Sequence, residues 1–79
     1  MVKINIEFSK QALKFLNKQD NITKKRILVA IYNLPSGDVK KLVGINSYRL
    51  RVGDFRIIFD KKGNVIFIEK INNRGDVYK

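Results

Sequence analysis

Alternation of hydrophobic and polar residues marks four short stretches of this 79-residue chain. Because successive side chains of a strand point to opposite faces, each stretch predicts a half-buried β-strand. The predicted strands are residues 2–8, 48–52, 55–60 and 65–71. Gly53 and Asp54 separate the second from the third, and Lys62, Gly63 and Asn64 separate the third from the fourth. These residue types favour tight turns, so we expect two hairpins.

Apolar residues recur at helical spacing between the first two strands, which predicts two short helices. The first covers residues 10–19 and begins after Ser9, a suitable N-cap. The second covers residues 22–34; two residues that suit an N-cap precede it, and Pro35 ends it. We expect the pair to form a helical hairpin. The basic cluster at residues 24–26 is most simply a solvated face of the second helix.

The predicted order of elements is β-α-α-β-β-β, with residues 37–47 expected to be irregular. This order indicates an α+β fold, a small, mostly antiparallel, twisted sheet with the helical hairpin packed on one face. The first strand must pair with the later strands, and the other sheet face is expected to be open and basic. Residues 1–79 are expected to form a single domain. The aromatic core candidates are Phe8, Phe15, Tyr32, Phe55, Phe59 and Phe67.

The segment YRLRVGDFRIIF carries three arginines, Arg49, Arg51 and Arg56. Alternation places Arg49 and Arg51 on the polar face of one strand. Arg56 lies on the next strand, and whether it shares that face depends on the register of the hairpin, which alternation leaves open. Such a patch suits the binding of phosphates. The alternative is a set of solvated arginines that keep the sheet soluble and its edge unpaired.

The chain is strongly basic, which favours phosphate binding. It has 17 Lys and Arg residues against 7 Asp and Glu residues, a formal net charge of +10. An anionic partner is expected for such a domain, and nucleic acid is the commonest one. No apolar run is long enough to span a membrane and no signal peptide is visible. We therefore expect a cytoplasmic protein without a membrane partner.

Cysteine and histidine are both absent from the chain. Neither a disulfide nor a thiolate metal site is expected, and the usual general base is missing. Any catalysis is left to tyrosine, lysine, arginine and carboxylates.

Three parts of the sequence resemble the RelE branch of the RelE/ParE superfamily of toxin-antitoxin systems. They are the LVG step at residues 42–44, the YRLRVGDFRIIF hairpin and the closing NNRGDVYK. The resemblance covers essentially the whole chain and implies a toxin of a type II system, an mRNA interferase. Such toxins are metal-independent, ribosome-dependent endoribonucleases that cut messenger RNA in the A site, and no cofactor is expected. The resemblance also implies an acidic, RelB-like antitoxin that neutralises the toxin in a hetero-oligomer.

The resemblance assigns roles to individual residues. Arg56 matches the family arginine that holds the scissile phosphate, and Tyr78 matches the terminal tyrosine that stacks on a base or assists proton transfer. These two and Arg51 are the predicted catalytic residues. The predicted RNA-binding and phosphate-binding residues are Lys40, Lys41, Arg49 and Arg74.

The identity of the proton acceptor stays open. Some relatives carry lysines where this chain has Arg49 and Arg51, one of them a proposed base, and others carry a histidine where this chain has Asn73. A guanidinium is effectively never deprotonated, so neither arginine suits this role. Tyr78, Lys41, water or a ribosomal group remain as candidates.

Two other functions stay open. One is a ParE-like inhibitor of DNA gyrase, which has the same fold without ribonuclease chemistry, and the other is a degenerate toxin that only binds its antitoxin or RNA. The site residues also have plainer interpretations. Tyr78 can cover a sheet edge, Arg74 can pair with Asp76, and Lys40 and Lys41 can be ordinary loop charges.

Overall fold

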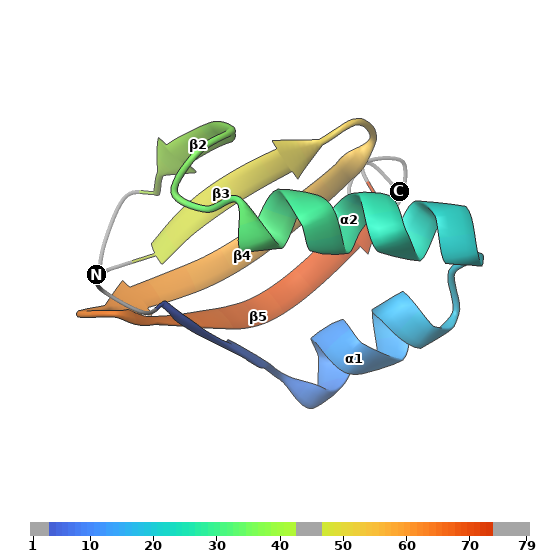
Figure 1. The fold of residues 1–79 in the computed structure, drawn as a ribbon, viewed down its shortest axis with the longest axis horizontal. Helices are drawn as coiled ribbons and strands as arrows, with labels where there is room; N and C mark the ends of the chain where they lie inside the picture. Colours follow the sequence, from blue (N-terminus) through green and yellow to red (C-terminus); the bar gives the residue numbers. More distant parts are fainter. Residues whose placement is uncertain (1–3, 43–46, 74–79) are drawn as a thin grey trace.

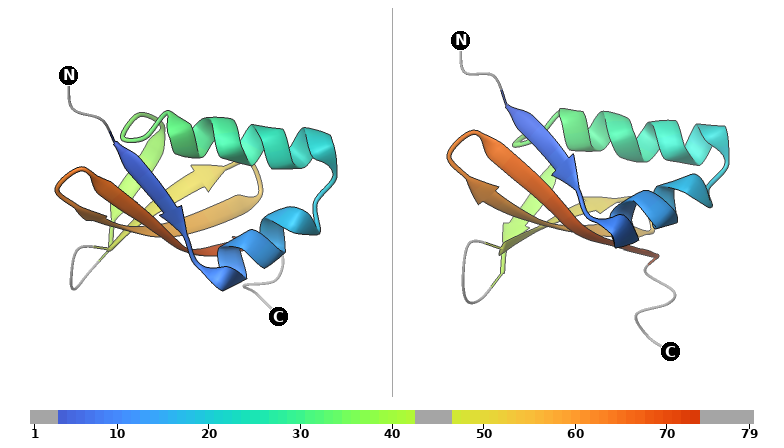
Figure 2. Two further views of the ribbon diagram at one scale, coloured as in Figure 1. Left: turned by 60° about the horizontal axis from the view of Figure 1, so that its bottom comes forward. Right: turned by 90° about the horizontal axis from the view of Figure 1, so that it is seen from below.

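The computed structural model describes residues 4–42 and 47–73, which form a five-stranded sheet and two helices (Figure 1). The elements are β1 (Asn5–Phe8), α1 (Lys10–Asn17), α2 (Asn21–Tyr32), β2 (Asp38–Lys41), β3 (Ser47–Val52), β4 (Phe55–Lys62) and β5 (Val65–Asn73). Both helices lie on the same face of the sheet (Figure 2), which confirms the expected α+β fold with a helical hairpin. No helix within these ranges is long and apolar enough to cross a lipid bilayer.

The strands lie in the order β1-β5-β4-β3-β2. β1 pairs with β5 in parallel, from Asn5 opposite Val65 to Phe8 opposite Ile68, and the other neighbours are antiparallel. The first strand therefore completes the sheet beside the last one, as expected. β1 and β2 lie at opposite edges of the sheet, and the chain between them forms α1 and α2. This connection therefore crosses one face of the sheet and places both helices over it.

The expectation that residues 37–47 are irregular was wrong for their first part. Asp38–Lys41 forms β2, an edge strand antiparallel to β3, so the sheet has one strand more than predicted. The segment DVKK has a single apolar residue, Val39, and four residues are too few to show a period of two. Its lysines suit an edge strand, because charge discourages pairing with other chains.

The core lies between the helices and the sheet and consists of aliphatic residues with one phenylalanine. Its buried members are Ala12, Leu16, Ile27, Ile31, Leu34, Leu50, Ile57, Phe59, Ile66, Ile68 and Ile71. Of the aromatic candidates, Phe59 is buried, and Phe8, Phe15 and Phe55 pack against the core while partly buried. The predictions for Tyr32 and Phe67 were wrong. Tyr32 is 63% exposed on α2, and Phe67, which lies between the buried Ile66 and Ile68 on β5, faces the side of the sheet that the helices do not cover.

A β-bulge between β4 and β5 sets which residues of β5 face the core. Ile58 lies opposite Lys70 but Phe59 lies opposite Ile68, so Glu69 is an extra residue on β5. This shift lets Ile68 and Ile71 both face the helices, although strict alternation would separate them. It also turns Lys70 to the open face of the sheet.

The start of α1 holds β5 where its pairing with β1 ends. The hydroxyl of Ser9 accepts a hydrogen bond from the amide of Ala12 at 3.1 Å, which caps the helix, and donates one to the carbonyl of Glu69 at 2.6 Å. The side chain of Gln11 donates to the carbonyl of Ile71 and accepts from its amide. These bonds satisfy backbone groups of β5 that have no strand partner on that side.

Replacing Ser9 by alanine is therefore expected to lower the free energy of unfolding by about 1–2 kcal/mol, because the helix cap and the bond to Glu69 are lost together. Urea unfolding followed by circular dichroism measures this loss. Ser36→Ala is the matched control, since Ser36 is exposed and contributes only a backbone bond to Asn33. Equal stability of the two variants would contradict the role given to Ser9.

Candidate nucleic-acid interface

The register of the β3–β4 hairpin decides whether Arg56 lies on the same face of the sheet as Arg49 and Arg51. Arg51 lies directly opposite Arg56, so the two side chains share one face of the sheet. Gly53, the first residue of the two-residue turn, has a φ of 57°, and no described residue other than glycine has a positive φ. This is the pattern of a type II′ turn, which fixes the register of a two-residue hairpin. Arg56 therefore joins Arg49 and Arg51 on the face that the helices do not cover.

Cross-strand neighbours on this face form two rows. The first row runs Asp38, Arg51, Arg56, Asn72 and the second runs Lys40, Arg49, Ile58, Lys70, across β2, β3, β4 and β5. Directly opposed side chains have Cβ atoms about 4.5–5.5 Å apart, so neighbouring members of a row can share one ligand. We call the cationic members of the two rows the basic face; they are Lys40, Arg49, Arg51, Arg56 and Lys70.

The guanidiniums of the basic face are available to an anion. Within residues 4–42 and 47–73 none of the three arginines forms an ion pair with a carboxylate. Arg51 is exposed and Arg49 and Arg56 are partly buried. The Nε atom of Arg49 is shielded from solvent and has no hydrogen-bond partner within the same ranges. An unpaired buried donor is costly, and a phosphate oxygen would satisfy it.

Of the other predicted site residues that lie within the described ranges, only Lys40 lies on the same face of the sheet as the three arginines. Lys40 lies opposite Arg49 and belongs to the basic face, whereas Lys41 lies opposite Tyr48 on the other face of β2. Lys41 is therefore not beside the arginines. Tyr78 and Arg74 lie outside the described residues, as does the expected pairing of Arg74 with Asp76.

Similar solved structures include chains of toxin-antitoxin complexes. In the RelB-RelE antitoxin-toxin complex of Methanococcus jannaschii, the matching chain is 31% identical to this one, with a TM-score of 0.74 over 91% of this chain and 94% of that chain. The chain belongs to the RelE family. The RelE-RelB complex of Pyrococcus horikoshii is similar at 29% identity, with a TM-score of 0.72 over 94% of this chain and 98% of that chain.

More distant solved structures share the fold. A chain of the DinJ-YafQ complex of Escherichia coli is 18% identical, with a TM-score of 0.67 over 99% of this chain and 100% of that chain. No family model matches the sequence, and a search of curated proteins finds no match. Membership of the RelE family therefore rests on the three-dimensional comparison and the identity that accompanies it.

The sequence analysis missed a carboxylate beside the arginines of this RelE-family chain. Asp38 is exposed and lies directly opposite Arg51 in the first row. Both residues line a hollow of about 300 Å³ between the end of α2 and β3, together with Gly37 and Leu50. Asp38 begins a strand that was not predicted, so no sequence signal paired it with the hairpin.

Arg26 was also missed, because its cluster was interpreted as a solvated helix face. Its side chain reaches across from α2 to the β3–β4 turn. A Cβ atom placed on Gly53 would lie 3.3 Å from a terminal guanidinium nitrogen of Arg26. The guanidinium of Arg26 therefore lies close to the turn that joins β3 to β4. Nothing in the periodicity of either segment relates the helix to the turn.

Replacing Gly53 by alanine is expected to lower the free energy of unfolding by about 1–2 kcal/mol, because alanine is strained at the positive φ of this position. The added methyl group would also crowd the guanidinium of Arg26, which should lower the stability further. Gly63→Ala is the matched control. Gly63 occupies the same place in the β4–β5 turn with a φ of 59°, but a Cβ there meets no atom within 4 Å. Urea unfolding should show the larger loss for Gly53→Ala, and adding Arg26→Ala should reduce the difference. Equal losses would show that the contact with Arg26 does not matter.

Proposed function

We propose that this chain is the toxin of a type II toxin-antitoxin system and cleaves messenger RNA in the ribosomal A site as a metal-independent endoribonuclease. Membership of the RelE family supports the toxin assignment. The observation that carries the cleavage assignment is the direct opposition of Arg51 and Arg56 on the uncovered sheet face. Two guanidiniums that approach one phosphate can stabilise the charge that develops on it during cleavage.

The reaction uses the 2′-hydroxyl of the RNA as the nucleophile. Its oxygen bonds to the phosphorus as it loses its proton, the bond from phosphorus to the 5′-oxygen breaks, and that oxygen takes up a proton. Arg51 and Arg56 stabilise the phosphate, Arg49 positions it, and Lys40 and Lys70 hold the flanking backbone. The products are a 2′,3′-cyclic phosphate and a 5′-hydroxyl end.

Asp38 is our candidate for the proton acceptor. It is the only carboxylate in the two described rows of the basic face, and it lies next to Arg51. A carboxylate can accept the proton of the 2′-hydroxyl, which an arginine cannot do. Lys41, the earlier lysine candidate, projects from the opposite face of β2. Tyr78 and Arg74 complete the proposal on the strength of the family resemblance, with Tyr78 engaging the nucleotide or returning the proton to the 5′-oxygen.

The proposed partners are the ribosome with its messenger RNA and a RelB-like, acidic antitoxin. The similar structures from Methanococcus jannaschii and Pyrococcus horikoshii are complexes of RelE with RelB. A net charge of +10 attracts an acidic protein by the same long-range field that attracts RNA. Since the substrate is a translated message, the proposed place of action is the cytoplasm.

A toxin that binds its antitoxin without cutting RNA is the second candidate. It is favoured by one feature of the sequence, the absence of histidine together with arginines at the family's lysine positions. Under this hypothesis Asp38 would not act as a base, and the basic face would bind RNA or the antitoxin alone.

Inducible expression with primer extension on a reporter message tests the proposal. We expect growth arrest and new 5′ ends inside translated codons, and no new ends when the start codon of the reporter is removed. Arrest without new ends, accompanied by double-strand DNA breaks that depend on gyrase, would instead support a ParE-like activity. The absence of both arrest and new ends would support the second candidate.

A further inference from the structure

The helix α2 is apolar on two opposite sides. Ile27 and Ile31 are completely buried against the sheet. On the outer side Ile22, Val29 and Tyr32 are 79%, 50% and 63% exposed. A surface helix of a globular protein normally carries polar residues on its outer face, and a helix that is apolar all round is normally buried. α2 is therefore covered by the sheet on one side and lacks a cover within the described residues on the other.

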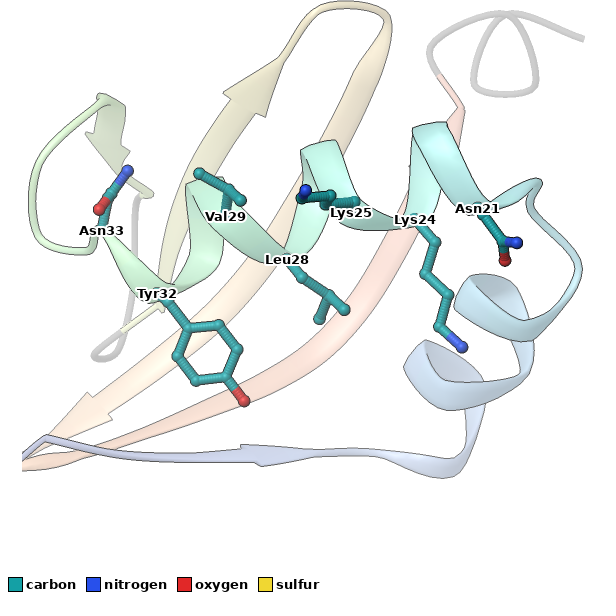
Figure 3. A pocket seen from close by; sticks show the side chains of 7 residues that line it. All are labelled: Asn21, Lys24, Lys25, Leu28, Val29, Tyr32 and Asn33. Carbon is teal, nitrogen blue, oxygen red and sulfur yellow. The ribbon is translucent and has the colours of Figure 1, made fainter.

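The outer side of α2 contains a groove with the geometry that accepts another helix. Seven residues line a hollow of about 430 Å³: Asn21, Lys24, Lys25, Leu28, Val29, Tyr32 and Asn33. They fall into two rows of residues four positions apart, one from Asn21 to Asn33 and the other from Lys24 to Tyr32 (Figure 3). A groove between two such rows is the surface into which the side-chain ridge of a second helix packs.

The charges at this groove select the partner. Lys24 and Lys25 lie toward the start of α2, while Leu28, Val29 and Tyr32 form its apolar part. A helix that presents apolar residues along one stripe and acidic residues at one end would fit both parts. A second copy of this chain fits poorly, because a two-fold contact would bring groups of lysines and two net charges of +10 together. RNA fits poorly too, because the basic face lies on the other side of the sheet and the groove is mostly apolar.

We propose that the outer groove of α2, lined by Lys24, Lys25, Leu28, Val29 and Tyr32, is the docking site of an amphipathic, acidic helix of the antitoxin. This inference rests on the proposed function. It adds that the groove and the basic face lie on opposite sides of the molecule, because α2 lies on one face of the sheet (Figure 2) and the paired Arg51 and Arg56 lie on the other. The helix bound in the groove anchors the antitoxin, and any block of the basic face requires a different segment of the antitoxin.

The experiment uses the full chain and the protein encoded by the adjoining reading frame, purified separately, with the affinity measured by isothermal titration calorimetry. Val29→Lys and Tyr32→Ala should each weaken binding at least tenfold, because they remove contact in the apolar part of the groove. Lys25→Glu should weaken binding and reduce its dependence on salt. Leu13→Lys on α1 is the matched control, since Leu13 is 47% exposed and lies outside the groove. All four variants should retain the cleavage or arrest shown by the parent chain.

The possible outcomes separate this inference from the proposed function. Tight binding by the parent chain that the groove variants leave unchanged would overturn the docking site and leave the toxin assignment in place. No binding by the parent chain would overturn the antitoxin partner and the docking site together. Sedimentation of the chain alone gives a further check, because a dimer abolished by Tyr32→Ala would show that a second copy fills the groove and would overturn the proposal. All four substituted side chains are exposed, so the variants are expected to fold.

Discussion

Replacing Arg56 by alanine is expected to lower the rate of message cleavage by about 100-fold to 1000-fold and to relieve growth arrest. The reason is the position of Arg56 opposite Arg51 on the basic face, where both guanidiniums can stabilise charge on the phosphate. Removing one preorganised donor from a site that stabilises a developing anion typically costs a factor of this size. Arg56→Lys should recover only part of the rate, because an ammonium cannot bind two phosphate oxygens in the planar, bidentate way of a guanidinium.

Lys61→Ala is the matched control for Arg56→Ala. Lys61 is an exposed cation on the same strand, β4, but its cross-strand neighbour is the buried Ile66, so it lies on the opposite face. This variant changes the net charge equally and should cut the reporter at nearly the parent rate. Primer extension at matched protein levels gives both rates. Full arrest and cleavage by a folded Arg56→Ala variant would refute the assignment of Arg56.

Replacing Asp38 by asparagine is expected to slow cleavage by about 100-fold to 10,000-fold without weakening the binding of RNA. The change keeps the shape of the side chain and removes its ability to accept a proton, and general acid-base catalysis contributes a factor in this range. Because Asp38 lies on β2 opposite Arg51, removing its charge should if anything favour the binding of an anion. A fall in cleavage accompanied by unchanged or tighter RNA binding would therefore be characteristic of a lost base.

Asp54→Asn separates loss of the base from loss of a negative charge. Asp54 lies in the hairpin turn between Arg51 and Arg56 in the sequence, is exposed and belongs to neither row. The Asp54→Asn variant should cleave within about twofold of the parent rate, since an exposed charge near a site contributes little to the interactions made there. Equal cleavage by the Asp38→Asn and Asp54→Asn variants would exclude Asp38 as the base and return the question to Tyr78, water or the ribosome.

Features that depend on neighbouring residues alone were predictable from the sequence. The strands of the C-terminal half, both helices and the two glycine turns follow from alternation, helical spacing and turn chemistry, and all are observed. Ser9 and Asp20 are observed as the N-caps. The shared face of Arg49 and Arg51 was also predictable, because two residues of one strand that are two positions apart always point the same way.

Features that depend on how distant segments pair were decided only by the tertiary structure. A slip of one residue in the hairpin would move Arg56 to the other face, so its position beside Arg51 required the register. The same holds for Asp38, whose four-residue strand is defined by its pairing with β3 rather than by its own pattern. The bulge opposite Ile58 and Phe59 brings Lys70 to the basic face, although alternation from Ile68 would turn it toward the core.

The helix α2 also has features that its sequence predicted and features that only the tertiary structure decided. Helical spacing identified the apolar stripe of α2 that includes Ile27 and Ile31, which are buried, whereas Tyr32, an aromatic core candidate on the same helix, is exposed. Spacing tells which residues share a side of a helix, whereas burial depends on what packs against that side. The sequence therefore determined every element except β2, together with the family resemblance. The position of Arg56 and Asp38 on either side of Arg51 exists only because strand register brings three strands side by side, whereas the groove of α2 lies within one helix, and the tertiary structure decided only which side of that helix stays uncovered.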